Sequence, residues 1–287
     1  MKPTSEKHLE ELTGLYSVGT AVSLRNYFAT AWKRRHFALA IPSEKIRTRH
    51  QHTLLGNLWN LLNPMLSAGI YFLIFAVILN ADTGIDNYIL WLVTGLFAYR
   101  LTSATVAQGA TSVTANEGLI RSLRFPRILL PVASTLGELL TFGFEFCVLV
   151  GFAIATGERM TWRALLLPLV LAVHTIFNLG FALIAARLND GFRDVEKLIP
   201  FIFHVLRYLS GVMVPLARFE EKSSPVLFQV LSLNPLAGIL DMYRWAFTGE
   251  LGGLSQLEIT RTIVVSVMIL FIGVKFFVSA ENRYGRP

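Results

Sequence analysis

The segment "NEGLIRSLRFPRILLP", residues 116–131, places three arginines and two prolines between two strongly apolar stretches. Each flanking stretch is long enough to cross a lipid bilayer as a helix, for which about 20 apolar residues suffice. Arginine-rich connections between spans lie preferentially in the cytoplasm. This hinge segment (116–131) therefore predicts a helical membrane protein with a short, basic cytoplasmic connection at its centre.

The composition of the whole chain is that of a membrane protein. Of its 287 residues, 53% are hydrophobic and only 16% are charged, with a mean hydropathy of +0.53. The net charge of +7 is typical of cytoplasmic loops and of contact with anionic lipid in so apolar a chain. We therefore predict a membrane partner and no nucleic-acid partner.

Six apolar stretches predict an all-α membrane protein with six transmembrane helices. An even number of crossings returns both termini to one side, and the positive-inside rule makes that side the cytoplasm. We thus expect a multi-pass protein of the cytoplasmic (inner) membrane with both termini cytoplasmic. The predicted spans are Trp59–Leu79, Tyr88–Val113, Ile128–Thr156, Ala164–Ala186, Leu198–Leu216 and Ile259–Ala280.

The polar region before the first span predicts an amphipathic helix. In residues 22–40, Leu24, Phe28 and Trp32 recur at four-residue spacing, while basic residues lie largely elsewhere on the helical wheel. Such a helix lies flat on the inner leaflet, and Pro42 is expected to break it. The alternative is a lipid anchor with no further role. We divide the chain into a cytoplasmic N-terminal region, 1–58, and a transmembrane domain, 59–287.

The outer connection between the fifth and sixth spans holds two apolar pieces, Pro225–Leu233 and Leu236–Phe247, separated by Asn234-Pro235. Each piece is too short to span the bilayer. The pattern favours a re-entrant helical hairpin that forms a lid on the outer face, or else a purely structural cap.

Common sequence motifs for nucleotide binding, metal binding and hydrolysis are absent. No GxxxxGK[ST], HExxH or GxSxG motif occurs, and the lone cysteine, Cys147, excludes a multi-cysteine metal site. We therefore predict no metal, no catalytic residue and no cofactor in this chain. An intramembrane lipid-modifying enzyme is the most distant alternative, with Glu138 and Glu145 as its candidate carboxylates.

Charged residues within the spans should find partners, because a charge at a helix centre costs about 2.5–3.5 kcal/mol on the insertion scale. Arg100 in the second span and Glu145 in the third lie at equal depth, so we expect them to pair. His174 with Asn178, and His204 with Arg207 and Tyr208, mark similar polar stripes on the fourth and fifth spans. These stripes are either polar contacts between helices or the lining of a hydrated passage.

Three segments in order resemble the membrane subunits of type-2 ABC exporters that move polysaccharides, the Wzm, O-antigen and teichoic-acid permease family. They are "TLLGNLWNLLNPML" (53–66), the hinge segment, and "LSLNPLAGILDMYRWAFTGE" (231–250). The similarity runs from about Arg47 to the C-terminus. Within the family, the sequence is most similar to actinobacterial exporters of cell-wall galactan.

The resemblance implies that the hinge segment forms a coupling helix that fits a groove on a separate ATP-binding subunit. An apolar ridge and nearby arginines suit such a contact. The alternative is a simple positive-inside anchor. The implied coupling residues are Asn116, Glu117, Leu119, Ile120, Arg121, Leu123, Arg124, Phe125, Pro126 and Arg127.

The resemblance also implies a homodimer with two ATP-binding subunits, which hold the ATP and magnesium, and a channel for a sugar polymer. Aromatic rings suit the apolar CH faces of sugars, although any single ring is equally compatible with core packing or an interface belt. The candidate channel residues are Tyr71, Trp91, Tyr99, Arg100, Glu138, Phe144, Glu145 and Tyr208.

Two further groups complete the predicted sites. Basic residues beside the inner leaflet, Lys33, Arg34 and Arg35, can receive the pyrophosphate head of a lipid-linked substrate, and we assign Trp32 to the same entry site. The expected outer gate consists of Asn234, Pro235, Tyr243 and Arg244.

Together these observations predict a transport subunit, not an enzyme, that exports a lipid-linked polysaccharide such as a galactan or an O-antigen-like polymer. The alternative is a type-2 ABC permease that exports a small amphipathic compound or drug.

Overall fold

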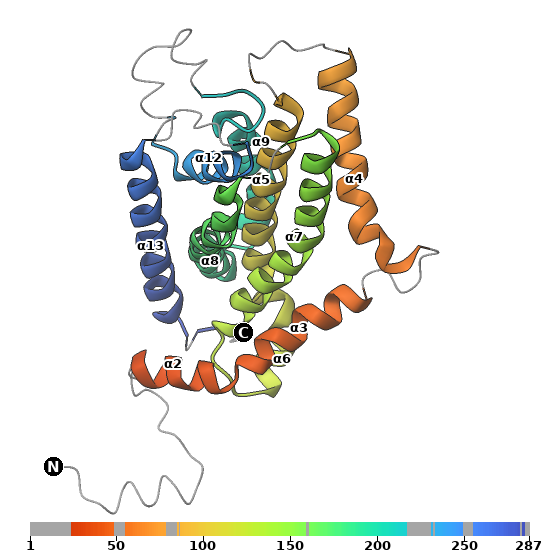
Figure 1. Ribbon diagram of the computed structural model, residues 1–287. Helices are drawn as coiled ribbons and strands as arrows, with labels where there is room; N and C mark the ends of the chain where they lie inside the picture. The colour runs from red at the N-terminus through yellow and green to blue at the C-terminus, as the bar shows by residue number, and fades with distance from the viewer. Residues whose placement is uncertain are drawn as a thin grey trace, which may run out of the picture.

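The structure is a helical bundle, with α2, α3 and α6 at one end and α12 near the other (Figure 1). This computed structural model describes residues 24–48, 55–78, 85, 87–158, 161–216, 231, 233–248, 255–281 and 283–284. Every regular element among them is helical, which confirms the predicted all-helical class. In chain order these are α2 (Leu24–Lys33), α3 (Arg35–Thr48), η1 (Gly56–Leu58), α4 (Trp59–Phe72), η2 (Leu73–Ile78), α5 (Tyr88–Thr111), η3 (Thr114–Asn116), α6 (Glu117–Ser122), α7 (Leu129–Ala155), η4 (Trp162–Leu166), α8 (Leu167–Gly191), α9 (Val195–Leu209), α12 (Pro235–Thr248) and α13 (Gln256–Val278).

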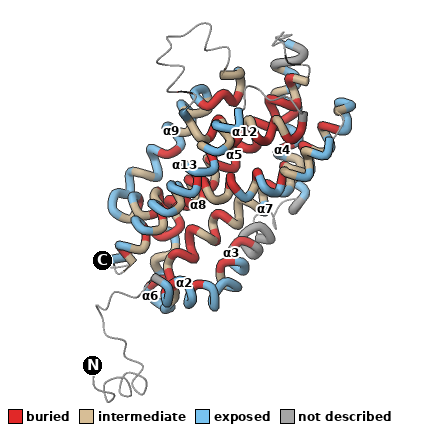
Figure 2. Tube along the Cα trace, turned by 60° about the vertical axis from the view of Figure 1, so that its left-hand side comes forward, coloured by how far each residue is buried: buried red, intermediate tan, exposed pale blue. Residues whose placement is uncertain are grey.

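Four helices in the described chain are long and apolar enough to cross a membrane: α5, α7, η4 with α8, and α13. Helix α5 lies at the centre and packs against α4, α7, α8, α9 and α12. Figure 2 shows its buried character beside the more exposed outer helices. The bundle is therefore organised around α5.

Two predicted spans have a more complex form. The first is helical from Trp59 to Ile78, but its last six residues form a π-helical turn. The fifth ends as a helix at Leu209, which corrects the predicted end at Leu216. Gly211 has φ of +66°, a left-handed conformation that glycine adopts without strain and that ends the helix. The count of six spans stays a prediction.

Helices α2 and α3 run across one end of the bundle, below α7 and α13 (Figure 1). The predicted break at Pro42 is wrong, because the chain turns at Arg34 and α3 continues through Pro42. Pro42 is buried and packs beside Gly137 of α7, so tertiary packing holds the helix through the proline.

The apolar face predicted for this region also differs. Tyr27, Ala31 and Ala38 face the bundle, whereas Phe28 and Trp32 are exposed. These exposed side chains are available to the lipid surface, so the amphipathic helix presents a second apolar face outward.

Helices α8 and α13 approach most closely where two glycines meet. A Cβ atom added at Gly273 would lie 2.5 Å from the carbonyl oxygen of Gly180. Small residues permit such close backbone contact between membrane helices. The glycines therefore set the position of the last span.

We expect Gly273→Ala to lower the free energy of unfolding by about 1–3 kcal/mol, since backbone atoms have to move apart. The matched control is Gly151→Ala in α7, where an added Cβ meets nothing within 4 Å. The midpoint of thermal unfolding in detergent measures both. Equal midpoints for the two variants would contradict the close crossing.

Candidate functional site

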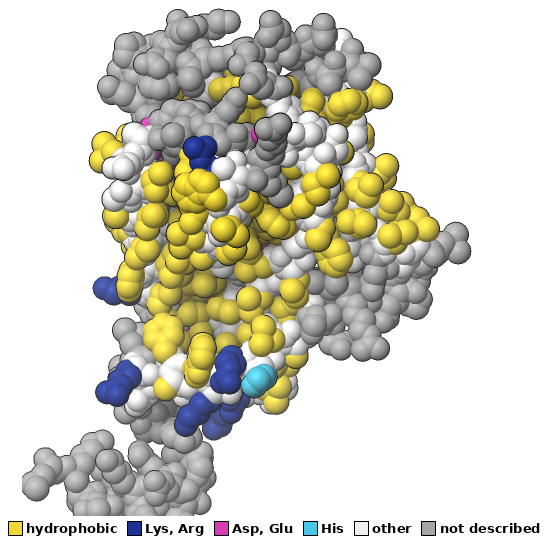
Figure 3. Space-filling model, viewed as in Figure 1, with side chains coloured by type: hydrophobic (Ala, Val, Ile, Leu, Met, Phe, Trp, Pro, Cys, Tyr) yellow, Lys and Arg dark blue, Asp and Glu magenta, His cyan; other side chains and the backbone are white. Residues whose placement is uncertain are grey.

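Basic side chains gather at the end of the bundle where α2, α3, α6 and the last turn of α13 meet; we call this the basic end. Figure 3 shows Lys and Arg below a broad apolar band on this face. Exposed basic residues there include Arg25, Lys33, Arg34, Arg35, Arg121, Arg124 and Arg283. This arrangement has the charge distribution of a cytoplasmic membrane surface.

The hinge segment forms a shorter helix than predicted, because α6 ends at Ser122. Leu123 is extended, and the residue before Pro126 is biased to extended conformations as well. Ile120 is buried in the chain's own core, so it is not part of an exposed apolar ridge. Arg121, Leu123 and Arg124 are exposed and form the accessible surface of the segment.

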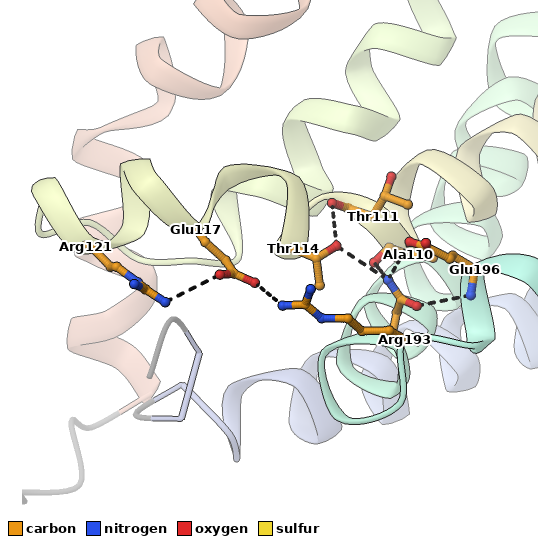
Figure 4. Close-up of polar contacts among 8 residues, drawn as sticks. Ala110, Thr111, Thr114, Glu117, Arg121, Arg193 and Glu196 are labelled. Carbon is orange, nitrogen blue, oxygen red and sulfur yellow. Dashed lines mark hydrogen bonds and ion pairs between the residues drawn. The ribbon is translucent and has the colours of Figure 1, made fainter. Parts of the chain in front are cut away.

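Glu117 joins α6 to the connection between α8 and α9 (Figure 4). Its carboxylate accepts a hydrogen bond from Arg193 Nη2 at 2.8 Å, and Arg121 Nη2 lies 3.5 Å from its other oxygen. Both partners are largely exposed, so the pairs contribute little stability on their own. Their role is to orient α6.

Asn189, a buried residue that sequence reasoning missed, strengthens the same junction. Its Nδ2 donates to the Ala110 carbonyl at 3.1 Å, and its Oδ1 accepts from Glu196 N at 3.0 Å. These bonds join the end of α5 to the end of α8 and the start of α9. No sequence motif marks Asn189, because only the fold brings its partners together.

A second junction ties the hinge segment to α2 and α13. Tyr27 OH donates to Glu281 Oε2 at 2.8 Å, and Arg127 N donates to Glu281 Oε1 at 2.9 Å. Ile128 N in turn donates to the Tyr27 oxygen at 3.3 Å. Burial raises the pKa of the Glu281 carboxyl, and burial likewise raises the pKa of the Tyr27 phenol.

The predicted lipid-head residues differ in their contacts. Arg34 donates to the Arg124 carbonyl, so it contacts the hinge segment. Arg35 lies over the Trp32 ring, 5.1 Å from its centroid, and both are exposed with Lys33 at the surface. Lys33 and Arg35 are therefore the exposed cations of this group that do not contact the hinge segment.

Between the basic end and the opposite end lies a polar cavity of about 310 Å³. The predicted pairing of Arg100 with Glu145 is confirmed, and Glu138 Oε2 lies 3.4 Å from Arg100 Nη1. The side chains come from α4, α5, α7 and α9. The lining residues are Asn60, Asn63, Pro64, Ser67, Tyr71, Leu96, Phe97, Tyr99, Arg100, Ser103, Thr141, Glu145 and Arg207.

The other predicted channel residues lie elsewhere. Trp91 is buried beneath Arg244, and Tyr208 is exposed on α9. Phe144 and Glu138 are outside the cavity lining, although Glu138 reaches Arg100. Asn60, Asn63 and Ser103 belong to the cavity but were missed, since single polar residues in apolar helices carry no spacing signal.

Opposite the basic end, Arg244 of α12 is buried in a dense polar contact. Its guanidinium lies 3.4 Å from the Trp91 ring centroid and donates to Asp241 at 2.8 Å and to the Gly211 carbonyl at 2.9 Å. Gly95 gives the guanidinium room, because a Cβ there would lie 2.4 Å from Arg244 Nη2.

The remaining predicted gate residues also have internal contacts. Asn234 Nδ2 donates to Ser210 Oγ at 2.9 Å, and Pro235 begins α12. Tyr243 OH lies 3.3 Å from His174 Nδ1, whose Nε2 lies 2.7 Å from Thr102 Oγ1. The first half of the predicted hairpin falls mostly outside the described residues, while α12 is packed among the spans.

The described part of the chain contains no group of three or more His, Cys, Asp or Glu residues that could hold a metal ion. Some buried polar side chains, such as Thr102 and His174, contact one another, and others line the polar cavity. Such an arrangement can hold and guide a polar molecule.

Comparison with known proteins gives consistent matches. The sequence model of the family described as "ABC-2 type transporter" matches residues 41–248. An O-antigen export system permease protein RfbA of Myxococcus xanthus is 25% identical over 254 residues, covering 88% of this chain and 95% of the relative. A protein of the same description from Klebsiella pneumoniae is 27% identical, covering 86% and 92%. The polysialic acid transport protein KpsM of Escherichia coli is 24% identical, covering 85% and 93%.

The raised pKa of Glu281 predicts a pH dependence. The folded protein binds the proton before the unfolded chain does as pH falls, so this group's contribution to stability increases as pH falls toward the unfolded pKa of about 4.3. Glu281→Gln removes the titration. The difference in unfolding midpoint, wild type minus variant, should therefore rise as pH is lowered from about 7 to about 5. A difference that stays constant or falls would contradict the assignment.

Proposed function

The chain belongs to the ABC-2 type transporter family, and we propose that it exports a lipid-linked polysaccharide across the inner membrane, driven by ATP that a partner subunit hydrolyses. It is a transport component of a type-2 ABC exporter, not an enzyme, and it works with an ATP-binding subunit. The observation that carries the proposal is the match along most of the chain to permeases whose names specify O-antigen and polysialic acid. A galactan or an O-antigen-like polymer is the substrate class that we propose.

The hinge segment is the proposed coupling element. Its exposed Arg121, Leu123 and Arg124 combine a cationic and an apolar contact on one short projection. Glu117 and Arg127 link that projection to α8–α9 and to α2–α13 respectively. A force applied at the projection is thus shared by several helices instead of being lost in a loose loop.

We further propose six crossings with both termini in the cytoplasm, and a division between residues 1–58 and 59–287. Support comes from the Tyr27–Glu281 bond, which places α2 and the end of α13 at the same basic end. In this arrangement ATP and magnesium are bound by the partner subunit.

A homodimer with two ATP-binding subunits is the proposed assembly. Helix α9 supports it, because large apolar side chains are exposed along one face of a helix too short to be a typical independent span. These side chains are Leu198, Phe201, Ile202, Val205, Tyr208 and Leu209.

We propose two sites on the path of the substrate, one at its cytoplasmic entry and one at its outer exit. Lys33 and Arg35, beside exposed Trp32, are positioned to meet the pyrophosphate of a lipid-linked polymer at the basic end, with Arg34 linking them to the hinge segment. We assign the outer gate to Asn234, Pro235, Tyr243 and Arg244; the hydrogen bonds of Asn234 to Ser210 and of Arg244 to the Gly211 carbonyl would hold it together.

The coupling proposal is tested with Arg121→Glu and Leu123→Ser, which change exposed side chains and leave the core intact. In the complex with the ATP-binding subunit, reconstituted in nanodiscs, we expect each variant to lower ATPase activity and polymer export at least several-fold. Losing a contact at the centre of an interface weakens it by about 1–2 kcal/mol or more.

The matched control is Arg283→Glu, which makes the same charge change at another exposed position of the basic end. It should leave both activities near the wild-type value. If the hinge variants assemble and function like this control, the hinge segment is not the coupling element.

A further inference from the structure

We infer that the polar cavity between α4, α5, α7 and α9 is a binding site for one uncharged sugar residue of the transported polymer. This inference rests on the proposed function and assigns a place and a chemistry to part of it. Four properties of the cavity support it: balanced charge, unpartnered hydrogen-bonding atoms, aromatic walls and size.

The charges around the cavity balance. Arg100 and Arg207 line it, and Glu145 lines it as well, while Glu138 reaches Arg100 from just outside. Arg100 pairs with both carboxylates, and when Glu138 is counted with the lining residues the formal charge is zero. A phosphate or a free acid would need a net positive site, so the cavity suits a neutral, hydroxyl-rich ligand.

Several buried polar atoms in the cavity find no partner among the described residues. Asn60 is 8% exposed and its Nδ2 is unpaired; Glu145 is 4% exposed and its Oε2 is unpaired. The Nη2 of Arg100 is also buried without a hydrogen bond. A buried polar group without a hydrogen bond is unfavourable, so a ligand with donors and acceptors would be favoured there.

Hydroxyl groups on the walls supply acceptors. Ser67 donates to the Asn63 carbonyl at 2.8 Å, Ser103 donates to the Arg100 carbonyl at 3.1 Å, and Thr141 donates to the Gly137 carbonyl at 3.1 Å. Each proton is used within its own helix, which leaves the oxygen lone pairs free to accept. A sugar hydroxyl can donate to these oxygens and accept from Asn60 Nδ2.

Aromatic rings provide the apolar part of the site. Tyr71, Phe97 and Tyr99 line the cavity. The Tyr99 hydroxyl donates to the Phe203 carbonyl, so its polar group is already bonded and its ring serves as an apolar wall. A sugar ring presents CH groups on its faces and hydroxyls at its rim, which matches aromatic walls combined with polar ones.

The size of the cavity limits the ligand. A volume of about 310 Å³ lies at the lower end of the 300–1,000 Å³ range of small-molecule sites. The space therefore suits a single sugar unit. The site would hold one unit of the polymer at a time through several weak contacts, which allows release and forward movement.

The test uses cysteine protection, because the chain has only one cysteine, Cys147, and Cys147→Ser gives a background without thiols. In this background Ser103→Cys places a thiol on the cavity wall, and Thr260→Cys places one on an exposed turn of α13 as the control. The complex with its ATP-binding subunit, in nanodiscs, is labelled with a small charged methanethiosulfonate. The probe is lipid-linked polymer extracted from cells, compared with polyprenyl phosphate that carries no sugar.

We expect the polymer to slow labelling of Ser103→Cys several-fold and to leave Thr260→Cys unchanged, while polyprenyl phosphate protects neither. Unchanged labelling of Ser103→Cys by polymer that still stimulates the ATPase would overturn the site and leave the proposed function standing. Protection by polyprenyl phosphate alone would also overturn it, since the occupant would then be a lipid. A complex that neither binds the polymer nor is stimulated by it would remove the proposed function and the site together.

A second variant measures the contribution of the unpaired donor. Asn60→Leu should raise the polymer concentration for half-maximal ATPase stimulation about tenfold, which corresponds to one lost hydrogen bond of about 1.4 kcal/mol. Asn60→Gln, which keeps the amide, should recover part of that loss. Equal half-maximal concentrations for Asn60→Leu and the wild type would count against the site. If Asn60→Leu fails to assemble, the Ser103→Cys result decides.

Discussion

The structure depends on one constraint: polar side chains inside a membrane-spanning bundle have to find partners within the protein. Helix α5 satisfies this constraint in several directions. Arg100 pairs with Glu145 of α7, Thr102 contacts His174 of α8, and Trp91 lies against Arg244 of α12. Each contact fixes the rotation of a neighbouring helix relative to α5. Apolar packing alone specifies that rotation only weakly, because apolar side chains pack about as well against lipid as against one another.

Polar contacts also join neighbouring helices at each end of the molecule. At the basic end, Glu117 and Asn189 join the hinge segment to the α8–α9 connection, and Glu281 joins it to α2 and α13. At the opposite end, Arg244 and Tyr243 join α12 to α5 and α8. Helices that carry contacts at both ends can transmit a displacement along their length, and the polar cavity lies between those ends.

Much of this architecture could be predicted from apolar segment length and charge, because both act locally along the chain. The four long helices and the Arg100–Glu145 pair follow from span length and equal depth. The continuation of α3 through Pro42 could not be predicted, since packing on α7 outweighs the local cost of proline. Asn189 and Asn60 were missed for a similar reason. The partners of Asn189 lie on other helices, and the cavity that Asn60 lines is formed by several helices, so the residue spacing within one helix reveals neither.

We propose that this chain moves a lipid-linked polymer from the inner to the outer leaflet. Depleting the protein in growing cells and measuring the sidedness of lipid-linked polymer, with a probe that cannot cross the membrane, tests it most directly. The account predicts that polymer accumulates on the cytoplasmic side while synthesis of its lipid-linked precursor continues. Normal appearance of polymer on the outer side after depletion would contradict it.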